Sequence, residues 1–335
     1  MGSTFYSSVT RISDLAESAW APQTLDFEHW QTGHYVVVRI TRPSGRPDIE
    51  LANGRMSELM PGDTVVGALG VRHATLESVG DWRAVGVDRE MDLLTAGGLL
   101  GRVTSCSPFA GPITRGDYLG HVVAGGAPVS MGDFVQQHEP KPLAMPVVLI
   151  IGTSMSAGKT LSARLIVRRL RELGRVPVAA KFTGAGRYRD ILSMADAGAE
   201  AVFDFVDVGL PSTVCSDAEY RAAFEQLSAR IAATRADVLV AEAGASPLEP
   251  YQGALAVAGL VPTLCFTVLA ASDPYAVLGV TQAFKLKPDV VTGPATNTLA
   301  GEELIKKLTG LEPLNLFQPQ GLQRLDRLIE ERVNS

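Results

Sequence analysis

One stretch near the middle of the chain constrains its fold more than any other. Five apolar residues at 147–151 form a predicted buried strand, and a loop of small residues follows at 152–158. Lys159 and Thr160 then open a predicted helix that runs to about Leu173. A strand, a glycine-bounded loop and a helix in this order make a phosphate cradle. Backbone N–H groups wrap the phosphates, the lysine reaches the outer ones, and the threonine hydroxyl takes Mg²⁺. The alternative is a Gly-Lys-Thr turn that only caps a helix.

The loop is one residue longer than the common Walker A pattern. Five residues separate Gly152 from Gly158. We expect a nucleotide to contact the whole loop and the start of the helix. The predicted nucleotide-binding residues of this stretch are Gly152, Thr153, Ser154, Met155, Ser156, Ala157, Gly158, Lys159, Thr160 and Leu161.

Length, charge and cysteine content limit the classes of protein to which the chain can belong. A chain of 335 residues predicts two domains, and a content of 46% hydrophobic and 20% charged residues is ordinary for a globular protein. The formal net charge of −6 argues against a general nucleic-acid-binding surface. No apolar run approaches the ~20 residues that cross a bilayer, and no signal-peptide pattern is visible. The three cysteines lack metal-ligand spacing, so we expect a reduced, cytoplasmic protein.

The first part of the chain is β-rich in character. Short apolar runs alternate with turns that contain glycine or proline, such as 43–47 and Asn53-Gly54. This pattern predicts a small antiparallel barrel or sandwich over residues 1–135, followed by a proline-bearing linker at 136–146. The predicted strands are 35–40, 49–51, 64–70, 82–87, 99–105 and 118–123.

Strands and helices alternate over residues 147–335. This alternation predicts right-handed crossovers and a doubly wound, mostly parallel sheet, and therefore an α/β fold. The predicted strands are 147–151, 176–181, 238–242, 263–268 and 290–293, and the predicted helices are 159–173, 190–197, 217–234, 274–284 and 301–309. In such a sheet ligands bind at the carboxyl ends of the strands, and most of the candidate residues fall there.

Two charged residues end predicted strands at this edge. Lys181 precedes Thr183 and Gly184, and it can face the phosphate loop and bind an anionic substrate. The alternative is a solvated lysine at a strand end. Glu242 ends an apolar strand, where a carboxylate is costly to bury without a cation. A Mg²⁺ shared with nucleotide phosphates supplies that cation. The alternative is a capping or surface glutamate.

Four further residues are candidates for ligand binding. Asp207 either adds a metal contact or caps a helix or turn. Asn297, after the last predicted strand, either reads a nucleobase edge with its donor and acceptor or forms a turn or cap. In the β-rich part, Arg72 and His73 follow a glycine-bearing run. They either hold an anionic substrate or lie in a turn with a solvated arginine. The histidines lack zinc-ligand spacing.

Three segments together resemble one family. The run from Gly152 to Thr160 resembles the long P-loop of dethiobiotin synthetase, which begins Gly-Thr and ends Gly-Lys-Thr with the same spacing. The segment 181–184 resembles that family's Lys-Pro-x-x-(Thr/Ser)-Gly, shortened and without the proline. The segment 242–245 is similar to its Glu-Gly-Ala-Gly. The three follow in the family's order, so the resemblance implies a dethiobiotin-synthetase-like P-loop NTPase domain.

A second resemblance is to the D-glutamate N-acetyltransferase group, whose C-terminal domain is also dethiobiotin-synthetase-like. Its members pair an N-terminal domain with a late P-loop domain and carry a Glu–Gly–Ser–Pro-like segment comparable to 242–250. The dethiobiotin synthetase resemblance implies that Lys159 holds ATP phosphates, Thr160 and Glu242 bind Mg²⁺, and Lys181 faces a carboxylate or carbamate.

The chain departs from dethiobiotin synthetase in two respects. Ser154 and Ser156 stand where the family loop carries acidic residues, one of which helps to hold the metal. The N-terminal domain is also foreign to that enzyme. The resemblance therefore supports a reaction class rather than a particular reaction.

These patterns lead to a functional hypothesis. We expect a homodimeric, Mg-ATP-dependent enzyme that activates a small anionic carboxylate or carbamate by phosphoryl transfer, with Lys159, Lys181 and Glu242 as catalytic residues. The alternatives are a small-molecule kinase, an amino-acid N-acyltransferase, or a nucleotide switch of the metallochaperone type. ATP is favoured over GTP because no Asn-Lys-x-Asp guanine signature occurs. The early P-loop lysine of many switches is replaced by Thr153 and Ser154.

Overall fold

The computed structural model describes residues 2–45, 49–244 and 246–333, and the chain forms two compact units. Unit 1 comprises Met1–Gln137, Ala185–Arg189 and Phe205–Val214, and unit 2 comprises His138–Gly184, Asp190–Asp204 and Cys215–Ser335. The domain limits predicted from the sequence assign the segments 185–189 and 205–214 to the P-loop domain, whereas they belong to unit 1. Ala245, and part of the turn predicted at 43–47, lie outside the described residues.

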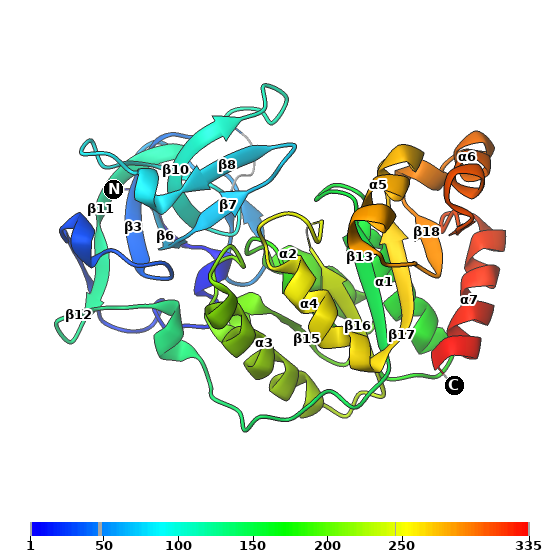
Figure 1. Ribbon diagram of the computed structural model, residues 1–335. Coiled ribbons are helices and arrows are strands. Elements are labelled where there is room, and N and C mark those ends of the chain that lie inside the picture. The colour runs from blue at the N-terminus through cyan, green and yellow to red at the C-terminus, as the bar shows by residue number, and fades with distance from the viewer. Residues whose placement is uncertain (1, 46–48, 245, 334–335) are drawn as a thin grey trace. The chain divides into compact units, whose positions relative to one another are not determined.

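Unit 1 is built on a small β-barrel (Figure 1). Its strands pair in the order β1-β6-β3-β11-β9-β10-β8-β7, and β6 also pairs with β10, so that β6, β3, β11, β9 and β10 close into a ring. The β1–β6 and β6–β10 pairs are parallel, unlike the antiparallel sheet that the sequence predicts. The strands are β1 (Thr4–Tyr6), β2 (Ala21–Gln23), β3 (Tyr35–Arg42), β4 (Ile49–Glu50), β5 (Met56–Ser57), β6 (Thr64–Leu69), β7 (Val71–His73), β8 (Ser78–Asp81), β9 (Glu90–Leu93), β10 (Leu99–Cys106), β11 (Arg115–Ala124) and β12 (Ala127–Pro128).

The two faces of β3 explain how the core of unit 1 is divided. Successive side chains of a strand point to opposite faces. Val36 and Val38 pack in one buried cluster with Met91 of β9. Val37, on the other face, packs in a second cluster that includes Phe205. Because Phe205 comes from the segment 205–214, that segment contributes to the core of unit 1.

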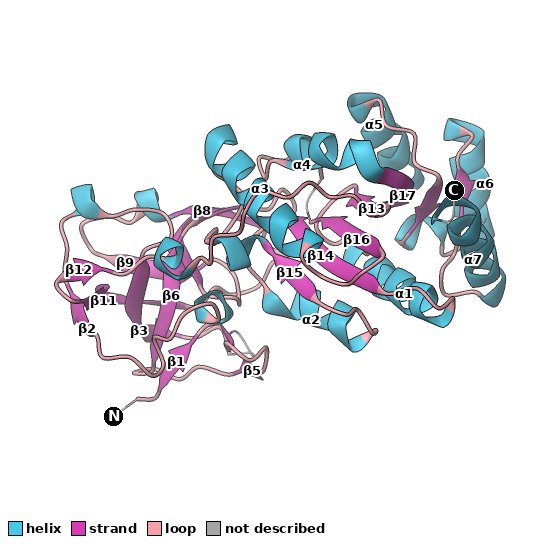
Figure 2. Cartoon of the chain, turned by 90° about the horizontal axis from the view of Figure 1, so that it is seen from below, coloured by secondary structure: helices cyan, strands magenta, loops and turns pink. Residues whose placement is uncertain are grey.

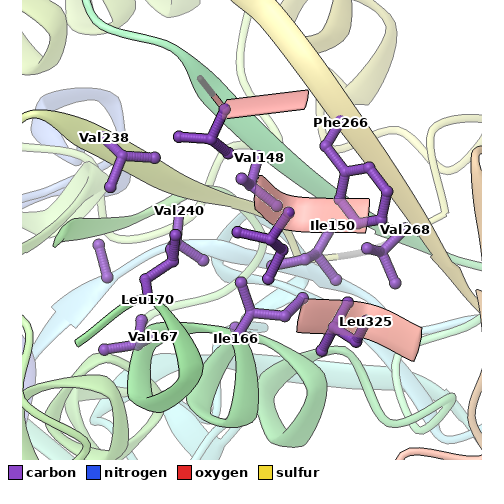
Figure 3. Packing of buried hydrophobic residues seen from close by; sticks show 14 of the residues in the cluster. Val148, Ile150, Ile166, Val167, Leu170, Val238, Val240, Phe266, Val268 and Leu325 are labelled. Atoms are coloured by element: carbon purple, nitrogen blue, oxygen red, sulfur yellow. The ribbon is translucent and has the colours of Figure 1, made fainter. Parts of the chain in front are cut away.

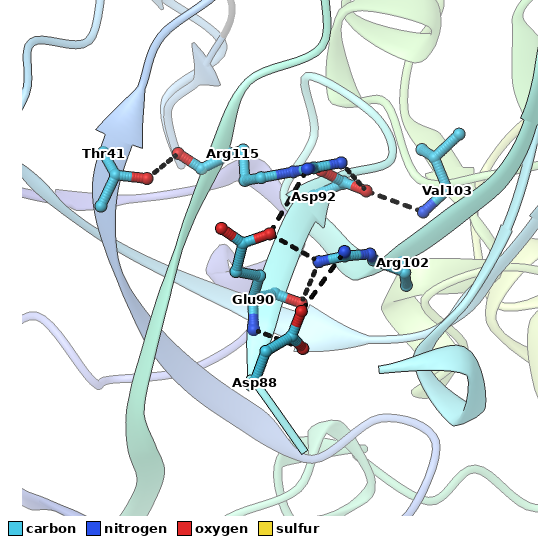
Figure 4. A network of polar contacts seen from close by, with 7 residues as sticks. All are labelled: Thr41, Asp88, Glu90, Asp92, Arg102, Val103 and Arg115. Atoms are coloured by element: carbon cyan, nitrogen blue, oxygen red, sulfur yellow. Dashed lines mark hydrogen bonds and ion pairs between the residues drawn. The ribbon is translucent and has the colours of Figure 1, made fainter. Parts of the chain in front are cut away.

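A network of ion pairs connects three strands of the barrel (Figure 4). Asp92 of β9 is fully buried, accepts from Nε of Arg115 at 2.6 Å and also accepts from the backbone N–H of Val103 at 2.9 Å. Glu90 accepts from Nη1 of both Arg102, at 3.1 Å, and Arg115, at 3.4 Å. The carboxylates raise the pKa of Arg115, with the Asp92 hydrogen bond as the main cause and burial opposing it. The network therefore fixes the positions of β9, β10 and β11 relative to one another.

The strand predicted at 82–87 is wrong. The chain pairs earlier, in β8, and residues Trp82–Ala84 form a short 3₁₀ helix. The side chain of Asp81 accepts a hydrogen bond from the backbone N–H of Arg83 at 2.8 Å. An aspartate that bonds the backbone two residues ahead favours a turn over continued strand pairing.

Unit 2 is a doubly wound α/β domain with a seven-stranded parallel sheet, as the sequence predicts (Figure 1). The strand order is β15-β14-β16-β13-β17-β18-β19. The strands are β13 (Val147–Gly152), β14 (Pro177–Thr183), β15 (Val202–Asp204), β16 (Val238–Ala243), β17 (Leu264–Ala270), β18 (Val290–Thr292) and β19 (Glu312–Pro313). The helices are α1 (Lys159–Glu172), α2 (Tyr188–Asp196), α3 (Asp217–Ala232), α4 (Gly253–Leu260), α5 (Pro274–Phe284), α6 (Leu299–Thr309) and α7 (Pro319–Val333).

Helices cover both faces of this sheet (Figure 2). Helices α1, α2 and α7 share one buried cluster with the sheet, in which Ile166 and Leu170 of α1 and Leu325 of α7 pack against Val148 and Ile150 of β13 (Figure 3). Helix α4 contacts β14 and β16 together with α3. Every residue of β13 is buried, which is why this strand reads as a continuous apolar run in the sequence.

Candidate functional site

The phosphate loop lies between β13 and α1, at the carboxyl edge of the unit 2 sheet. Strands β14, β15 and β16 lie on one side of β13 and β17, β18 and β19 on the other, so the strand order switches there, the position at which open parallel sheets bind ligands. A Cβ on Gly152 would lie 2.7 Å from Cδ of Lys159, so glycine is needed for the lysine to cross the loop. Gly158 caps α1 with a φ of 96°, a left-handed conformation that favours glycine.

Lys159 is folded back onto the loop that precedes it. The residue is 1% exposed, and its Nζ donates to the carbonyl oxygen of Ser154 and, at 3.5 Å, to that of Met155. Burial lowers the pKa of Lys159 to about 8, although the nearby carboxylate of Glu242 opposes the shift. The ammonium group is therefore held by neutral carbonyl groups, and a phosphate would give it a full counter-charge.

Thr160 and Glu242 meet directly beside this lysine. The hydroxyl of Thr160, in the first turn of α1, donates to the carboxylate, with Oγ1 lying 3.2 and 3.1 Å from its two oxygens. Glu242 lies on the α1-facing side of β16, as does Val240 two residues before it. The carboxylate is 1% exposed, and burial raises its pKa against the opposing effects of Lys181 and Lys159. A buried carboxylate of this kind gains from a bound cation.

Lys181 lies next to Glu242 in the sheet, because the two residues are partners in the register of β14 and β16. Its ammonium group forms an ion pair with Asp190 of α2. Burial alone lowers the pKa of Lys181, but the carboxylates of Asp190 and Glu242 outweigh burial and raise it. Lys181 is therefore a charged group fixed at the carboxyl end of β14.

The end of β14 holds a hydroxyl group without a partner. Thr183 is fully buried, and its Oγ1 has no hydrogen-bond partner among the described residues. The backbone around it is tightly packed, because a Cβ on Gly244 would lie 2.1 Å from the carbonyl oxygen of Thr183. Gly184 follows with a φ of 137°. A buried hydroxyl group without a partner is uncommon in a protein interior.

The other side of the phosphate loop is held by the ends of β17 and β18. The backbone N–H of Thr153 donates to the carbonyl oxygen of Ala270 at 3.0 Å. The hydroxyl groups of Thr153 and Ser272 are 3.2 Å apart. A Cβ on Gly293, which follows β18, would lie 2.5 Å from the carbonyl oxygen of Ala157. These contacts fix the shape of the loop from the side opposite to Lys181 and Glu242.

Asn297 lines a cavity of about 510 Å³ at the carboxyl ends of β18 and β19. Asn315, Gln318 and Arg324 also line it. This volume lies in the range of small-molecule sites, and amide side chains offer both donors and acceptors. The short segment that leads from β18 to Asn297 begins at Gly293, which packs against the loop. The role of Asn297 in base recognition stays a prediction.

The other predicted loop residues differ in exposure. Ala157 is fully buried and Ser154 is 9% exposed, whereas Met155 is half-buried. Ser156 and Leu161 are exposed, the latter in the first turn of α1. The loop itself offers hydroxyl and carbonyl groups but no carboxylate, and the carboxylate that the structure brings to Thr160 comes from β16.

Three predicted site residues belong to unit 1. Asp207 lies in a 3₁₀ helix at Phe205–Val208, and its carboxylate pairs with Arg11 at 3.0 Å. Arg72 and His73 lie in β7, where Arg72 pairs with Glu77 and His73 is exposed. The predicted metal role of Asp207 and the predicted substrate role of Arg72 and His73 stay predictions.

Asp190 is a residue of the candidate site that the sequence analysis missed. It enters that analysis only as the start of a predicted helix, yet it is the ion-pair partner of Lys181. Its one sequence signal is an acidic residue in the first turn of a helix that follows a strand ending in lysine. That signal is too common to single the residue out.

The donor set at the edge of the sheet fits Mg²⁺ and a polyphosphate. A threonine hydroxyl and a carboxylate are the oxygen ligands that Mg²⁺ prefers, and this ion commonly completes its shell with phosphate oxygens and water. The described residues contain no group of three or more His, Cys, Asp and Glu side chains able to hold a metal ion. No helix in the described part of the chain is both long and apolar enough to span a bilayer.

No protein-family model matches the chain, and no curated protein matches its sequence. Among solved structures, chloroplast FtsY from Physcomitrella patens is similar at 13% identity over 53% of this chain and 61% of its own, with a TM-score of 0.37. HypB from Helicobacter pylori, solved in complex with nickel, is similar at 13% identity over 57% of this chain and 87% of its own, with a TM-score of 0.36. A DUF1611 family protein from Anabaena variabilis is similar at 15% identity over 58% and 62%, with a TM-score of 0.40.

The chain thus spans about three fifths of the FtsY and DUF1611 chains. The fold of unit 2 rests on its own geometry. A buried strand, a glycine-bounded loop and a helix that opens with Lys159 and Thr160 stand at the switch point of a parallel sheet. Unit 2 has the P-loop NTPase fold.

Proposed function

We propose that unit 2 binds a Mg²⁺–nucleoside triphosphate and transfers its terminal phosphoryl group. One observation carries the proposal: Thr160 at the foot of α1 meets the buried carboxylate of Glu242 within 3.2 Å, beside the buried ammonium group of Lys159. A hydroxyl, a carboxylate and a cation are the three groups that phosphoryl transfer needs around the triphosphate.

Each side chain has a distinct role in this proposal. Lys159 exchanges its carbonyl partners for phosphate oxygens and neutralises charge that develops during transfer. Thr160 and Glu242 hold Mg²⁺, which when bound screens the phosphates and lowers the charge barrier to attack. Lys181, kept protonated by Asp190, binds the anionic end of the acceptor. Thr183 adds a hydroxyl group for the same acceptor.

We infer that the acceptor is a small carboxylate or carbamate. Its oxygen attacks the terminal phosphorus, the bond to the nucleoside diphosphate breaks, and the acyl phosphate then loses inorganic phosphate when a nitrogen or other nucleophile attacks its carbonyl carbon. A permanently charged lysine beside the metal-binding carboxylate supports an anionic acceptor. The resemblance of three segments to dethiobiotin synthetase supports the same reaction class. ATP is the proposed nucleotide, because the sequence lacks a guanine signature.

Nucleotide turnover with purified protein tests this proposal. The assay follows ADP, AMP and phosphate release with ATP or GTP, in the presence of a panel of amino and dicarboxylic acids. We expect acid-stimulated release of ADP that is lost in Lys159→Ala and in Lys181→Ala. Release of AMP and pyrophosphate would exclude an acyl phosphate, and full turnover in Lys159→Ala would exclude the phosphate loop as the site.

A nucleotide switch is the second candidate function, and exposed apolar side chains favour it. Leu248, Tyr275, Leu299 and Phe317 are 62–77% exposed, and each follows a strand at the carboxyl edge of the unit 2 sheet. Large apolar side chains in such positions are typical of contact surfaces. We propose a second copy of the chain as the partner. Light scattering with and without nucleotide tests dimer formation. A specific rate of hydrolysis that rises with protein concentration and is unaffected by added acids would favour the switch over the ligase.

A further inference from the structure

Unit 1 contains a cavity of its own, with a volume of about 490 Å³. Its walls come from β7, β8, β9 and β10 and from the loop between β10 and β11. One lining residue, Arg187, comes from the segment Ala185–Arg189, which belongs to unit 1. The volume suits a metabolite-sized ligand.

Arg72 presents a fixed guanidinium group to this cavity. Its Nη1 donates to the carbonyl oxygen of Leu94 at 2.7 Å, and its Nη2 pairs with Glu77. Its Nε is buried and has no hydrogen-bond partner in the part of the chain that the structure describes. This Nε is shielded from the cavity space, so Arg72 contributes the charge of a fixed guanidinium group to the wall rather than a free donor.

Arg187 extends from a backbone that is anchored on both sides. Before it, the N–H of Gly186 donates to the carbonyl oxygen of Pro211 at 2.9 Å. After it, the N–H groups of Tyr188 and Arg189 donate to the buried carboxylate of Glu50 at 2.7 and 2.9 Å. The guanidinium group of Arg187 itself forms no ion pair with any described residue. Arg187 is exposed, so the cavity has a cation whose backbone is fixed and whose guanidinium group is open to a ligand.

The rest of the lining is suited to an organic anion. Among the described lining residues the acidic side chain is that of Glu77, against the two arginines. Apolar side chains of Leu76, Val103 and Ile113 line the same cavity. A guanidinium group binds a carboxylate through two parallel hydrogen bonds, and apolar walls receive the carbon chain attached to it.

We propose that this cavity binds a small organic carboxylate, with the carboxylate on Arg187 beside the guanidinium group of Arg72 and the carbon chain against the apolar wall. The proposal does not rest on nucleotide turnover, because Lys159, Lys181 and Glu242 are not among the residues that line the cavity. The proposal would still hold if the chain showed no nucleotide turnover.

Isothermal titration of the full chain tests the proposal. The probes are butyrate, valerate, succinate and glutarate, with butyramide as the neutral analogue and inorganic phosphate as the inorganic anion. We expect at least one carboxylate to bind once per chain, and Arg187→Gln to weaken that binding by about tenfold or more, the usual loss with a charge-assisted hydrogen bond. Arg189→Gln is the matched control. It removes the same charge two residues away, from an exposed side chain that does not line the cavity, and should change the affinity less than about twofold.

Four results would overturn the proposal. The first is that no carboxylate binds, and the second is that butyramide or phosphate binds as tightly as the best carboxylate. The third is that Arg187→Gln and Arg189→Gln weaken binding equally. The fourth is that Lys159→Ala abolishes the binding, which would place the carboxylate at the phosphate loop. Retained binding in Lys159→Ala together with its loss in Arg187→Gln is the result that supports it.

Discussion

At the residue scale, the partners of each buried charge decide its protonation. Lys159 and Lys181 are both at most 5% exposed, yet burial lowers the pKa of Lys159 while the carboxylate of Asp190 helps to raise that of Lys181. Among the described residues, the hydrogen-bond partners of Lys159 Nζ are carbonyl oxygen atoms. The phosphate loop therefore holds the cation with the weaker compensation, and a bound triphosphate would supply the missing counter-charge.

This difference predicts a pH dependence of nucleotide affinity. The free protein loses the Lys159 proton near pH 8, whereas bound phosphates favour the ammonium form and raise its pKa. Binding above pH 8 must then take up a proton, so Kd should be nearly constant below about pH 8 and rise by up to about tenfold per pH unit above it. Titration calorimetry on both sides of this pH measures the effect. The rise of Kd with pH should disappear in Lys159→Ala. An equal rise in that variant would mean that another group takes up the proton on binding.

Glu242→Gln should separate stability from function. Glutamine keeps an oxygen that can accept from Thr160 and removes a buried charge whose pKa burial raises, while Asp190 remains to pair with Lys181. We expect an unchanged or higher melting temperature without nucleotide, because the cost of burying the carboxylate outweighs the attraction of Lys181 and Lys159. Mg²⁺-dependent turnover should fall by about 10-fold to 100-fold or more. Glu303→Gln, on an exposed part of α6, is the control. It should change neither the melting temperature nor the Mg²⁺-dependent turnover. A strongly destabilised Glu242→Gln would contradict this account.

At the element scale, long buried strands and long helices are the parts that the sequence predicts. The predicted strand at 147–151 is β13, and the helices predicted at 159–173 and 274–284 are α1 and α5 within one residue. Each has a strong local signal, either an unbroken apolar run or a capping residue. Helix α5, for example, begins with Asp273 bonded to two backbone N–H groups and with Pro274 in its first turn.

The missed elements lack such a signal. Strands β15 and β19 span three and two residues, too short for any alternation to show. Helix α4 is apolar on all sides, with no polar face to set a helical period. Helix α7 does bury Leu325, Ile329 and Val333 at intervals of four, but charged and amide residues surround them. The parallel β6–β10 pairing joins distant parts of the chain, and no local pattern predicts it.

The ion-pair network of β9, β10 and β11 gives a prediction about the barrel. Asp92→Ala removes a fully buried carboxylate and leaves Arg115 and the N–H of Val103 without their acceptor. We expect a loss of about 2–4 kcal/mol in the free energy of unfolding, measured in urea. Asp88→Asn changes the half-exposed end of the same network, where the pair with Arg102 spans 3.4 Å. It should cost less than about 1 kcal/mol. Equal losses in the two variants would mean that burial does not decide the energetics.

At the scale of the whole molecule, the sequence predicts the residues at strand ends but not their distant partners. Lys181 and Glu242 were recognisable because a charge ends an apolar strand, and the parallel sheet then placed them side by side. Asp190 reaches Lys181, and Arg187 lines the cavity of unit 1, because of the path that the chain takes after β14, and the sequence carries no period or motif for that path. The sequence did not predict the cavity of unit 1 for the same reason.

Acid should destabilise unit 1 through a pair of buried histidines. Burial lowers the pKa of His121 to about 4, with His34 adding to the effect, and burial also lowers the pKa of His34. The unfolded chain binds these protons from about pH 6.5 downward and the folded chain does not, so stability present above pH 6.5 is lost as the pH falls toward 4. His121 should account for at most about 3 kcal/mol of this loss, because residual solvation of the ring reduces the effect.

Unfolding in urea at several pH values measures this loss. His121→Gln should flatten the pH dependence in this window, while His29→Gln, which replaces an exposed histidine, should leave it unchanged. A pH dependence that survives in His121→Gln would assign the acid sensitivity to other groups.

The assignment of residues 185–189 and 205–214 to unit 1 has a consequence for how the protein is made and how it can evolve. A ribosome delivers the chain from its N-terminus, and domains tend to fold as they emerge. The ring strands are synthesised early, but Arg11 and Glu50 can meet Asp207 and the N–H groups of Tyr188 and Arg189 only after the phosphate loop and β14 have been synthesised. Recombination at the linker would separate these partners, so we expect exchange of either half alone to destabilise unit 1.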